Sequence, residues 1–103
     1  MKVDYDSEGR SLLFEFGASG RDDHVEELSR GECFVWVLDG RPNSIQLLNA
    51  DTDVEVLEEA AERFQLDAAA LMAAAQAALA APDREITIEV GRQRLLGSEA
   101  KAA

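Results

Sequence analysis

The chain has 103 residues, 47% of them hydrophobic, which suits one domain that buries roughly two-thirds of its unfolded surface. It carries 21 acids against 10 bases, a formal net charge of -11, and the acidic excess is spread over both halves of the chain. This charge argues against direct binding to nucleic acid or to anionic membranes, because both depend mainly on Lys and Arg.

Cysteine use and the terminal sequence indicate the compartment. The single cysteine, Cys33, lies in a predicted apolar strand and has no partner for an intramolecular disulfide. Residues 1–6 are charged where a secretory signal needs an apolar run. The longest uncharged segment, residues 68–82, is mostly alanine and too short to span a bilayer. We therefore expect a cytoplasmic protein.

The first predicted elements are three short strands. Residues 2–6 and 12–16 each alternate between apolar and polar side chains, which predicts a hairpin with its turn between them. A glycine-containing connection follows. The acidic segment at residues 22–28 is predicted to be an edge strand, because charge protects an edge from unwanted pairing.

The strongest local signal is the pair Asp39 and Gly40 between two β-prone runs, residues 33–38 and 41–48. An Asp-Gly pair in this setting predicts a two-residue hairpin turn. The first strand of this hairpin is apolar on both faces, so both need cover. One face carries Cys33, Val35 and Val37, and the other carries Phe34, Trp36 and Leu38.

Two helices are predicted over residues 52–80, where the apolar period changes from two to three or four. Thr52 with Glu55 three residues later is a capping-box signature for the first helix. Asp67 is the candidate N-cap of the second helix. That helix has ten alanines among residues 68–81, which gives it a high helix propensity and a thin side-chain layer.

A strictly alternating segment at residues 85–90 predicts a last strand with Ile86 and Ile88 on one face. Two arrangements are open for it. The helical connection allows a crossover that places it parallel to an earlier strand. It can also lie at an edge and pair with a second copy of the chain.

The expected fold class is α+β, with an antiparallel sheet of five to six strands built from hairpins and two helices packed on one face. This single domain covers residues 1–94, and a flexible tail is expected after it. The sheet is assigned to residues 1–50, the helices to 52–80, the last strand to 85–90 and the tail to 95–103.

The first half of this pattern is similar to a known family. Residues 3–6, the apolar strand at 12–16 and the closing run at 45–50 together resemble the bacterial domain-of-unknown-function family 2283. The resemblance covers residues 1–50 and implies a similar sheet, but no activity, because the family has no assigned chemistry. Some members look like one half of a toxin and antitoxin pair. The chain departs from the family pattern at Ser44, Gln46 and Asn49, which replace a glycine, an acid and an aspartate.

No catalytic group is expected from the motifs. His24 and Cys33 are the single residues of their kinds, and a nucleophile and base must lie within hydrogen-bond reach. No orienting motif surrounds either, so a surface histidine and a core cysteine explain them better. The adjacent acids at 26–27 and 58–59 point apart on a strand or a helix, as solvated residues do. We expect no enzyme activity.

No metal or cofactor is expected either. Asp51, Asp53, Glu55 and Glu62 imitate the ligand spacing of a calcium loop, but Val56 replaces the glycine of its sharp turn. An acidic helix start explains the same residues better. One histidine and one cysteine do not make a zinc site, and the glycine-containing connection lacks the lysine of a phosphate loop.

The feature that indicates a function is the second apolar face of residues 33–38. Two helices can cover one face of the sheet. If they cover the Cys33 side, an apolar patch stays open beside Leu13 and Leu48, and such a patch usually marks a partner site. If they cover the Trp36 side, the smaller residues face water. We favour the first arrangement, with the interface residues Phe34, Trp36, Leu38, Ile86 and Ile88.

The sequence therefore predicts a small acidic interaction module that associates with itself, most simply as a homodimer. The alternative is an acidic inhibitor of a basic partner protein, either antitoxin-like or mimicking nucleic acid. The net charge of -11 and the family resemblance motivate this alternative.

Overall fold

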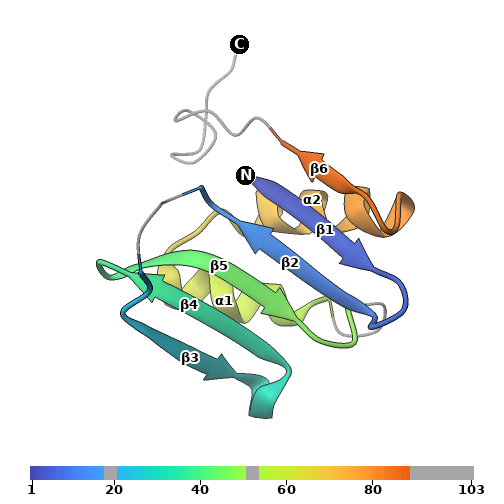
Figure 1. The fold of residues 1–103 in the computed structure, drawn as a ribbon. Coiled ribbons are helices and arrows are strands. Elements are labelled where there is room, and N and C mark those ends of the chain that lie inside the picture. Colours follow the sequence, from blue (N-terminus) through green and yellow to red (C-terminus); the bar gives the residue numbers. More distant parts are fainter. Residues whose placement is uncertain (18–20, 51–53, 89–103) are drawn as a thin grey trace.

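A computed structural model of the chain describes residues 1–17, 21–50 and 54–88. They form a six-stranded antiparallel sheet in the order β3-β4-β5-β2-β1-β6, with two helices on one side (Figure 1). The predicted α+β class is confirmed. The strands are β1 (Lys2–Asp6), β2 (Ser11–Glu15), β3 (His24–Leu28), β4 (Cys33–Leu38), β5 (Arg41–Leu47) and β6 (Glu85–Thr87); the helices are α1 (Val56–Phe64) and α2 (Ala68–Ala80), and a short 3-10 helix, η1 (Ser29–Gly31), joins β3 to β4.

The β4–β5 hairpin forms as its sequence predicts. Asp39 and Gly40 both have positive φ angles, 54° and 76°, as a type I′ turn requires. Beyond the turn Pro42 lies opposite Val37 and Ser44 opposite Trp36, which leaves one extra residue in β5. This bulge explains how a central strand accommodates proline, which cannot donate to the ladder.

The core lies between the sheet and the helices. Side chains alternate along β1, β2 and β4, and on these strands those that face the helices are almost fully buried. Because α2 contributes mostly alanine, its backbone can lie close to the sheet. α1 lies against β4 and β5 and α2 against β1 and β6, so the helices cover the Cys33 side of β4, the first of the two arrangements that the sequence left open. The core residues are Val3, Tyr5, Leu12, Phe14, Leu28, Cys33, Val35, Val37, Ile45, Leu47, Ala50, Leu57, Ala60, Ala61, Leu71, Ala74, Ala75 and Ala78.

The N-cap predicted from the sequence is confirmed for α2. Asp67 caps α2, and its carboxylate accepts a hydrogen bond from the Ala70 backbone N–H at 3.1 Å. By contrast, α1 begins at Val56 after a turn, and Glu55 precedes it without a side-chain cap. Thr52, where the capping-box pattern starts the first helix, lies outside the described residues.

The last strand lies at an edge. β6 pairs antiparallel with β1, with Ile86 opposite Val3, so a parallel crossover is wrong. The turn before β6 explains this direction, because it is tied to the β1–β2 hairpin. The Ser7 backbone N–H and hydroxyl donate to the Asp83 carboxylate at 2.9 and 2.6 Å, and the Asp83 N–H donates to the Tyr5 carbonyl at 2.7 Å.

The opposite edge is tied to α1. Arg63 Nε donates to Glu26 Oε1 at 2.7 Å, and His24 Nε2 lies 3.0 Å from Glu26 Oε2. The Ser29 hydroxyl donates to Glu59 on α1 at 2.6 Å. The hydrogen bonds from His24 and Arg63 lower the pKa of Glu26. β3 is thus the edge strand predicted, and its charged side chains anchor the helix beneath it.

Neighbouring residues of β2 differ in burial, and this difference predicts how much each contributes to stability. Phe14→Ala should lower the free energy of unfolding by about 3–5 kcal/mol, because it leaves a cavity in the core. Leu13→Ala, one position away on the other face, should cost less than about 1 kcal/mol. Urea denaturation of dilute protein measures both. Equal costs would contradict the assignment of the two faces.

The hydrogen bonds of Glu26 and Asp83 predict that the stability of the fold decreases in acid. Hydrogen bonds from the Ser7 hydroxyl and backbone lower the pKa of Asp83, as those from His24 and Arg63 do for Glu26. A lowered folded pKa adds stability above the unfolded value, and this stability is lost as the pH falls below about 4. Glu26→Gln and Asp83→Asn should therefore each flatten the acid limb of the stability curve. Urea denaturation midpoints measured as a function of pH check this. If the acid limb of the stability curve has the same slope in the variants as in the wild type, the prediction is wrong.

Candidate functional site

The strongest candidate site is the side of the sheet that faces away from the helices, here called the open face. None of the described elements covers it (Figure 1). On it Leu13 is 37% exposed and Val25 is 49% exposed, and the side chains of Phe34, Trp36 and Leu38 are half-buried. An apolar surface of this kind on a single chain usually marks a binding site.

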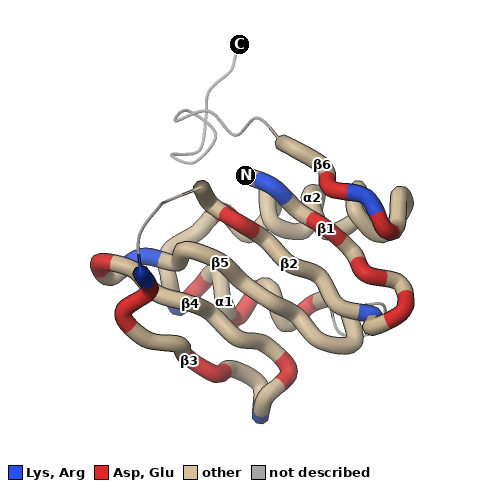
Figure 2. Tube along the Cα trace, viewed as in Figure 1, with Lys and Arg blue, Asp and Glu red and all other residues tan. Residues whose placement is uncertain are grey.

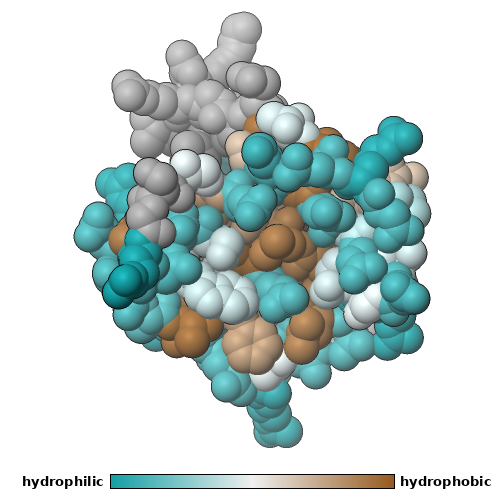
Figure 3. Space-filling view, in the orientation of Figure 1, coloured by the Kyte–Doolittle hydropathy of each residue, from teal (hydrophilic) through white to brown (hydrophobic). Residues whose placement is uncertain are grey.

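The aromatic side chains of β4 form the centre of the open face. The rings of Phe34 and Trp36 lie 6.2 Å apart between centroids and are tilted by 44°, within the range of favourable aromatic pairs. Figure 3 shows hydrophobic side chains gathered over the middle of this face, with hydrophilic ones around them. On β5 the neighbouring open-face residues are Ser44 and Gln46, which are polar but uncharged.

The charges of the open face lie on the strands that flank β4 and β5. β3 contributes Glu27, β2 contributes Glu15, and β1 contributes Lys2 and Asp4. Figure 2 shows acidic residues on β1 and β3, with uncharged residues over most of β4 and β5. An apolar centre inside a charged rim is the usual composition of a protein–protein interface.

The structure separates the five interface residues expected from the sequence. Phe34 and Trp36 lie together on the open face, and Leu38, at the end of the same strand, also lines a cleft beside the β4–β5 turn. Ile86 and Ile88 instead pack at the edge of the core, because Ile86 is opposite the buried Val3. The two groups therefore do not form one surface. Val25 on β3 was not among the expected interface residues, although an apolar residue among the acids of an edge strand is a usable signal.

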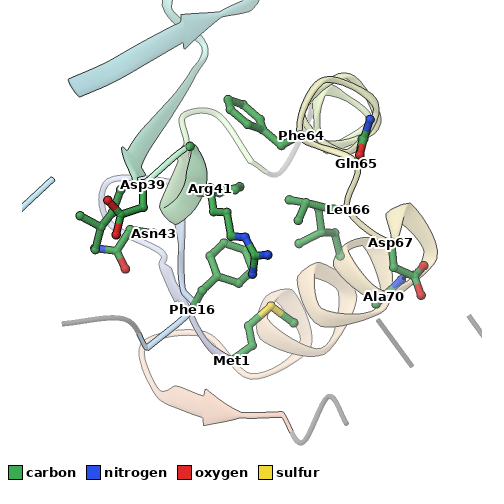
Figure 4. A pocket seen from close by; sticks show the side chains of 14 residues that line it. Met1, Phe16, Asp39, Arg41, Asn43, Phe64, Gln65, Leu66, Asp67 and Ala70 are labelled. Atoms are coloured by element: carbon green, nitrogen blue, oxygen red, sulfur yellow. Dashed lines mark hydrogen bonds between the residues drawn. The ribbon is translucent and has the colours of Figure 1, made fainter. Parts of the chain in front are cut away.

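A second candidate is a cleft of about 840 Å³ where the β4–β5 turn meets the connection between α1 and α2 (Figure 4). Its walls are largely apolar, and Arg41 points into the middle, between Phe16 and Leu66. Two acids, Asp39 and Asp67, oppose this single base, and Asp67 is already engaged in capping α2. The cleft thus offers an apolar surface with one cation and no convergent pair of reactive groups.

The residues that could act in nucleophilic catalysis are not brought together. His24 is opposite Val37 and Cys33 is opposite Leu28, so they lie at opposite ends of the β3–β4 pair. His24 is exposed and contacts Glu26, whereas Cys33 is fully buried. Burial, with the nearby charge of Glu59, raises the pKa of the Cys33 thiol to about 11. A thiol in this state is a poor nucleophile.

Neither a metal centre nor a membrane segment is found in the described part of the chain. Within residues 1–17, 21–50 and 54–88, no three His, Cys, Asp or Glu side chains gather so as to hold a metal ion. Asp51 and Asp53 of the calcium-like spacing lie outside these ranges. None of the described helices is long and apolar enough to cross a membrane.

The environment of Cys33 predicts its reactivity. In the folded protein the thiol should resist an aromatic disulfide reagent at pH 8, because it is both buried and protonated. The same protein in concentrated urea should release one equivalent of chromophore per chain. Rapid stoichiometric labelling without urea would contradict the buried position.

Comparison with known proteins adds no family or relative. No protein-family model, curated protein or solved structure matches the chain. The resemblance of residues 1–50 to domain-of-unknown-function family 2283 stays a prediction.

Proposed function

We propose that this protein is a small acidic interaction module that associates with itself as a homodimer through the open face of its sheet. The proposal rests on the side chains of Phe34, Trp36 and Leu38, which follow one another along β4 on a face that no described element covers. A strand with one solvated face normally alternates between apolar and polar residues. β4 does not alternate, so its second apolar face has a use other than the core.

Burial of aromatic surface is the main stabilising contribution expected for the homodimer. An aromatic side chain buries about 150–250 Å² when fully covered, and burial contributes about 25 cal/mol per Å². Phe34 and Trp36 are half-buried in the single chain, so both still have apolar surface to lose to a partner. Trp residues near the centre of a patch are the usual hot spots of interfaces.

A second copy suits the shape and charge of the open face. Two sheets pack face to face about 10 Å apart, as in β-sandwiches. Six strands about 4.8 Å apart and about five residues long give a face of roughly 29 by 17 Å, to which side-chain relief adds area. The flat area is about 490 Å², so the side-chain relief has to supply the rest of the roughly 800 Å² per partner of a standard interface. Because the centre is uncharged, a second copy brings no like charges together there.

The buried reduced thiol of Cys33 is consistent with a module that works in a reducing compartment such as the cytoplasm. Self-association through β4 leaves this thiol in the core of each protomer, away from the interface. The proposal therefore involves no disulfide between subunits.

The second candidate function is the acidic inhibitor of a basic partner. The charge of -11 and the rim acids Glu15 and Glu27 around an apolar centre support it. Such a partner would present an apolar patch with a basic rim, and its binding would weaken with salt.

The homodimer predicts a strong effect of Trp36→Glu. The substitution places a charge at the centre of the interface and should raise the dimer dissociation constant about thirtyfold or more, as hot-spot losses do. Ala73→Glu, on the exposed side of α2, is the matched control and should leave the dissociation constant unchanged. Sedimentation equilibrium measures both. A monomeric wild-type protein, or a dimer indifferent to Trp36→Glu, would refute the homodimer.

The salt dependence of association distinguishes the two proposed functions. Two protomers of charge -11 repel each other, so screening should strengthen the homodimer between about 0.05 M and about 0.5 M salt. A complex with a basic partner should weaken over the same range. A native mass spectrum of untagged protein from its own host, taken at low salt, identifies either species. A heteromeric mass with a basic companion, lost at high salt, would favour the inhibitor.

A further inference from the structure

We infer that the two-fold axis of the homodimer crosses the strands, so that Phe34 of each protomer packs on the partner's Trp36 and Lys2 pairs with the partner's Asp4. This inference rests on the proposed function, since it specifies how the open face recognises a second copy of itself. It follows from the register of the sheet and from the position of each charge on it.

Residues opposite one another on neighbouring strands share a face, so the open face is organised in rows that run across the sheet. Two successive rows occupy its middle. The first row consists of Glu27, Phe34, Gln46, Leu13, Asp4 and Glu85, and the second consists of Val25, Trp36, Ser44, Glu15, Lys2 and Thr87.

The proposed two-fold axis lies in the plane of the interface, perpendicular to the strands and midway between these two rows. Rotation about it places each strand on the same strand of the partner and exchanges the two rows. The first row of one protomer then meets the second row of the other, position by position. No carboxylate meets a carboxylate. The facing pairs are Phe34 with Trp36, Asp4 with Lys2, Gln46 with Ser44, Leu13 with Glu15, Glu27 with Val25 and Glu85 with Thr87, each occurring twice by symmetry.

Axes parallel to the strands give poorer pairs. An axis between β4 and β5 places Phe34 on Gln46 and leaves β1, with its charges, outside the contact. An axis between β5 and β2 places β4 on β1, so that Phe34 meets Asp4 and Trp36 meets Lys2. Of the three, the crossing axis alone pairs aromatic with aromatic and base with acid.

The two kinds of pair have different roles. The aromatic pairs lie near the centre and supply affinity, whereas the Lys2 and Asp4 pairs lie at the rim and set orientation. Packed sheets are rotated by about 30°, which displaces outer pairs more than central ones. The long, flexible side chain of Lys2 can follow this displacement.

The test uses charge reversal. Lys2→Glu places acid against acid at two symmetric positions, and Asp4→Lys places base against base, so each variant alone should dimerise about tenfold more weakly than wild type. An equimolar mixture of the two variants should form a heterodimer, because every reversed charge then faces its opposite. The Lys2→Glu/Asp4→Lys double variant is the matched control and should regain the homodimer.

Native mass spectrometry of the mixture resolves the species by mass, and thermal unfolding of each variant by circular dichroism checks its fold. A statistical mixture of weak dimers, or no loss in the single variants, would overturn the crossing axis. If Trp36→Glu still dissociates the dimer in that case, the proposed function stands and the geometry fails. If Trp36→Glu has no effect, both fail.

Discussion

The constraint on which the rest of the structure depends is that β4 is apolar on both faces while two helices can cover one. The helices take the side with Cys33, Val35 and Val37, where α1 lies against β4 and β5 and buries Leu57, Ala60 and Ala61. The larger residues, Phe34 and Trp36, are left on the other side. On β4 the smaller residues thus fill the core, and the larger ones keep the exposed surface on which the proposed association rests.

The edges of the sheet are protected in a different way at each end. At the β3 edge, Glu26 holds Arg63 and His24 through polar contacts that also anchor α1. The other edge is β6, a strand of only three residues, and Asp83 fixes the turn before it. Protected edges favour association through the open face over strand addition.

In the proposed homodimer, charge sets the selectivity of association. Every acid of the open face lies outside the uncharged centre formed by β4 and β5. The net charge of -11 opposes random association between copies, so only an arrangement that keeps carboxylates apart can form. In the proposed homodimer Lys2 then gains importance, because it is the cation of the two middle rows and can pair with an acid of the partner.

The sequence by itself determined the local elements. The Asp39-Gly40 turn, the Asp67 cap and the alternation of the strands act over a few residues, so their outcome is visible in the chain. Tertiary structure decided which face of β4 the helices cover, the antiparallel edge position of β6, and the separation of Ile86 from Trp36. These depend on contacts between segments far apart in sequence, as when Asp83 binds Ser7, and local periodicity carries no information about such contacts.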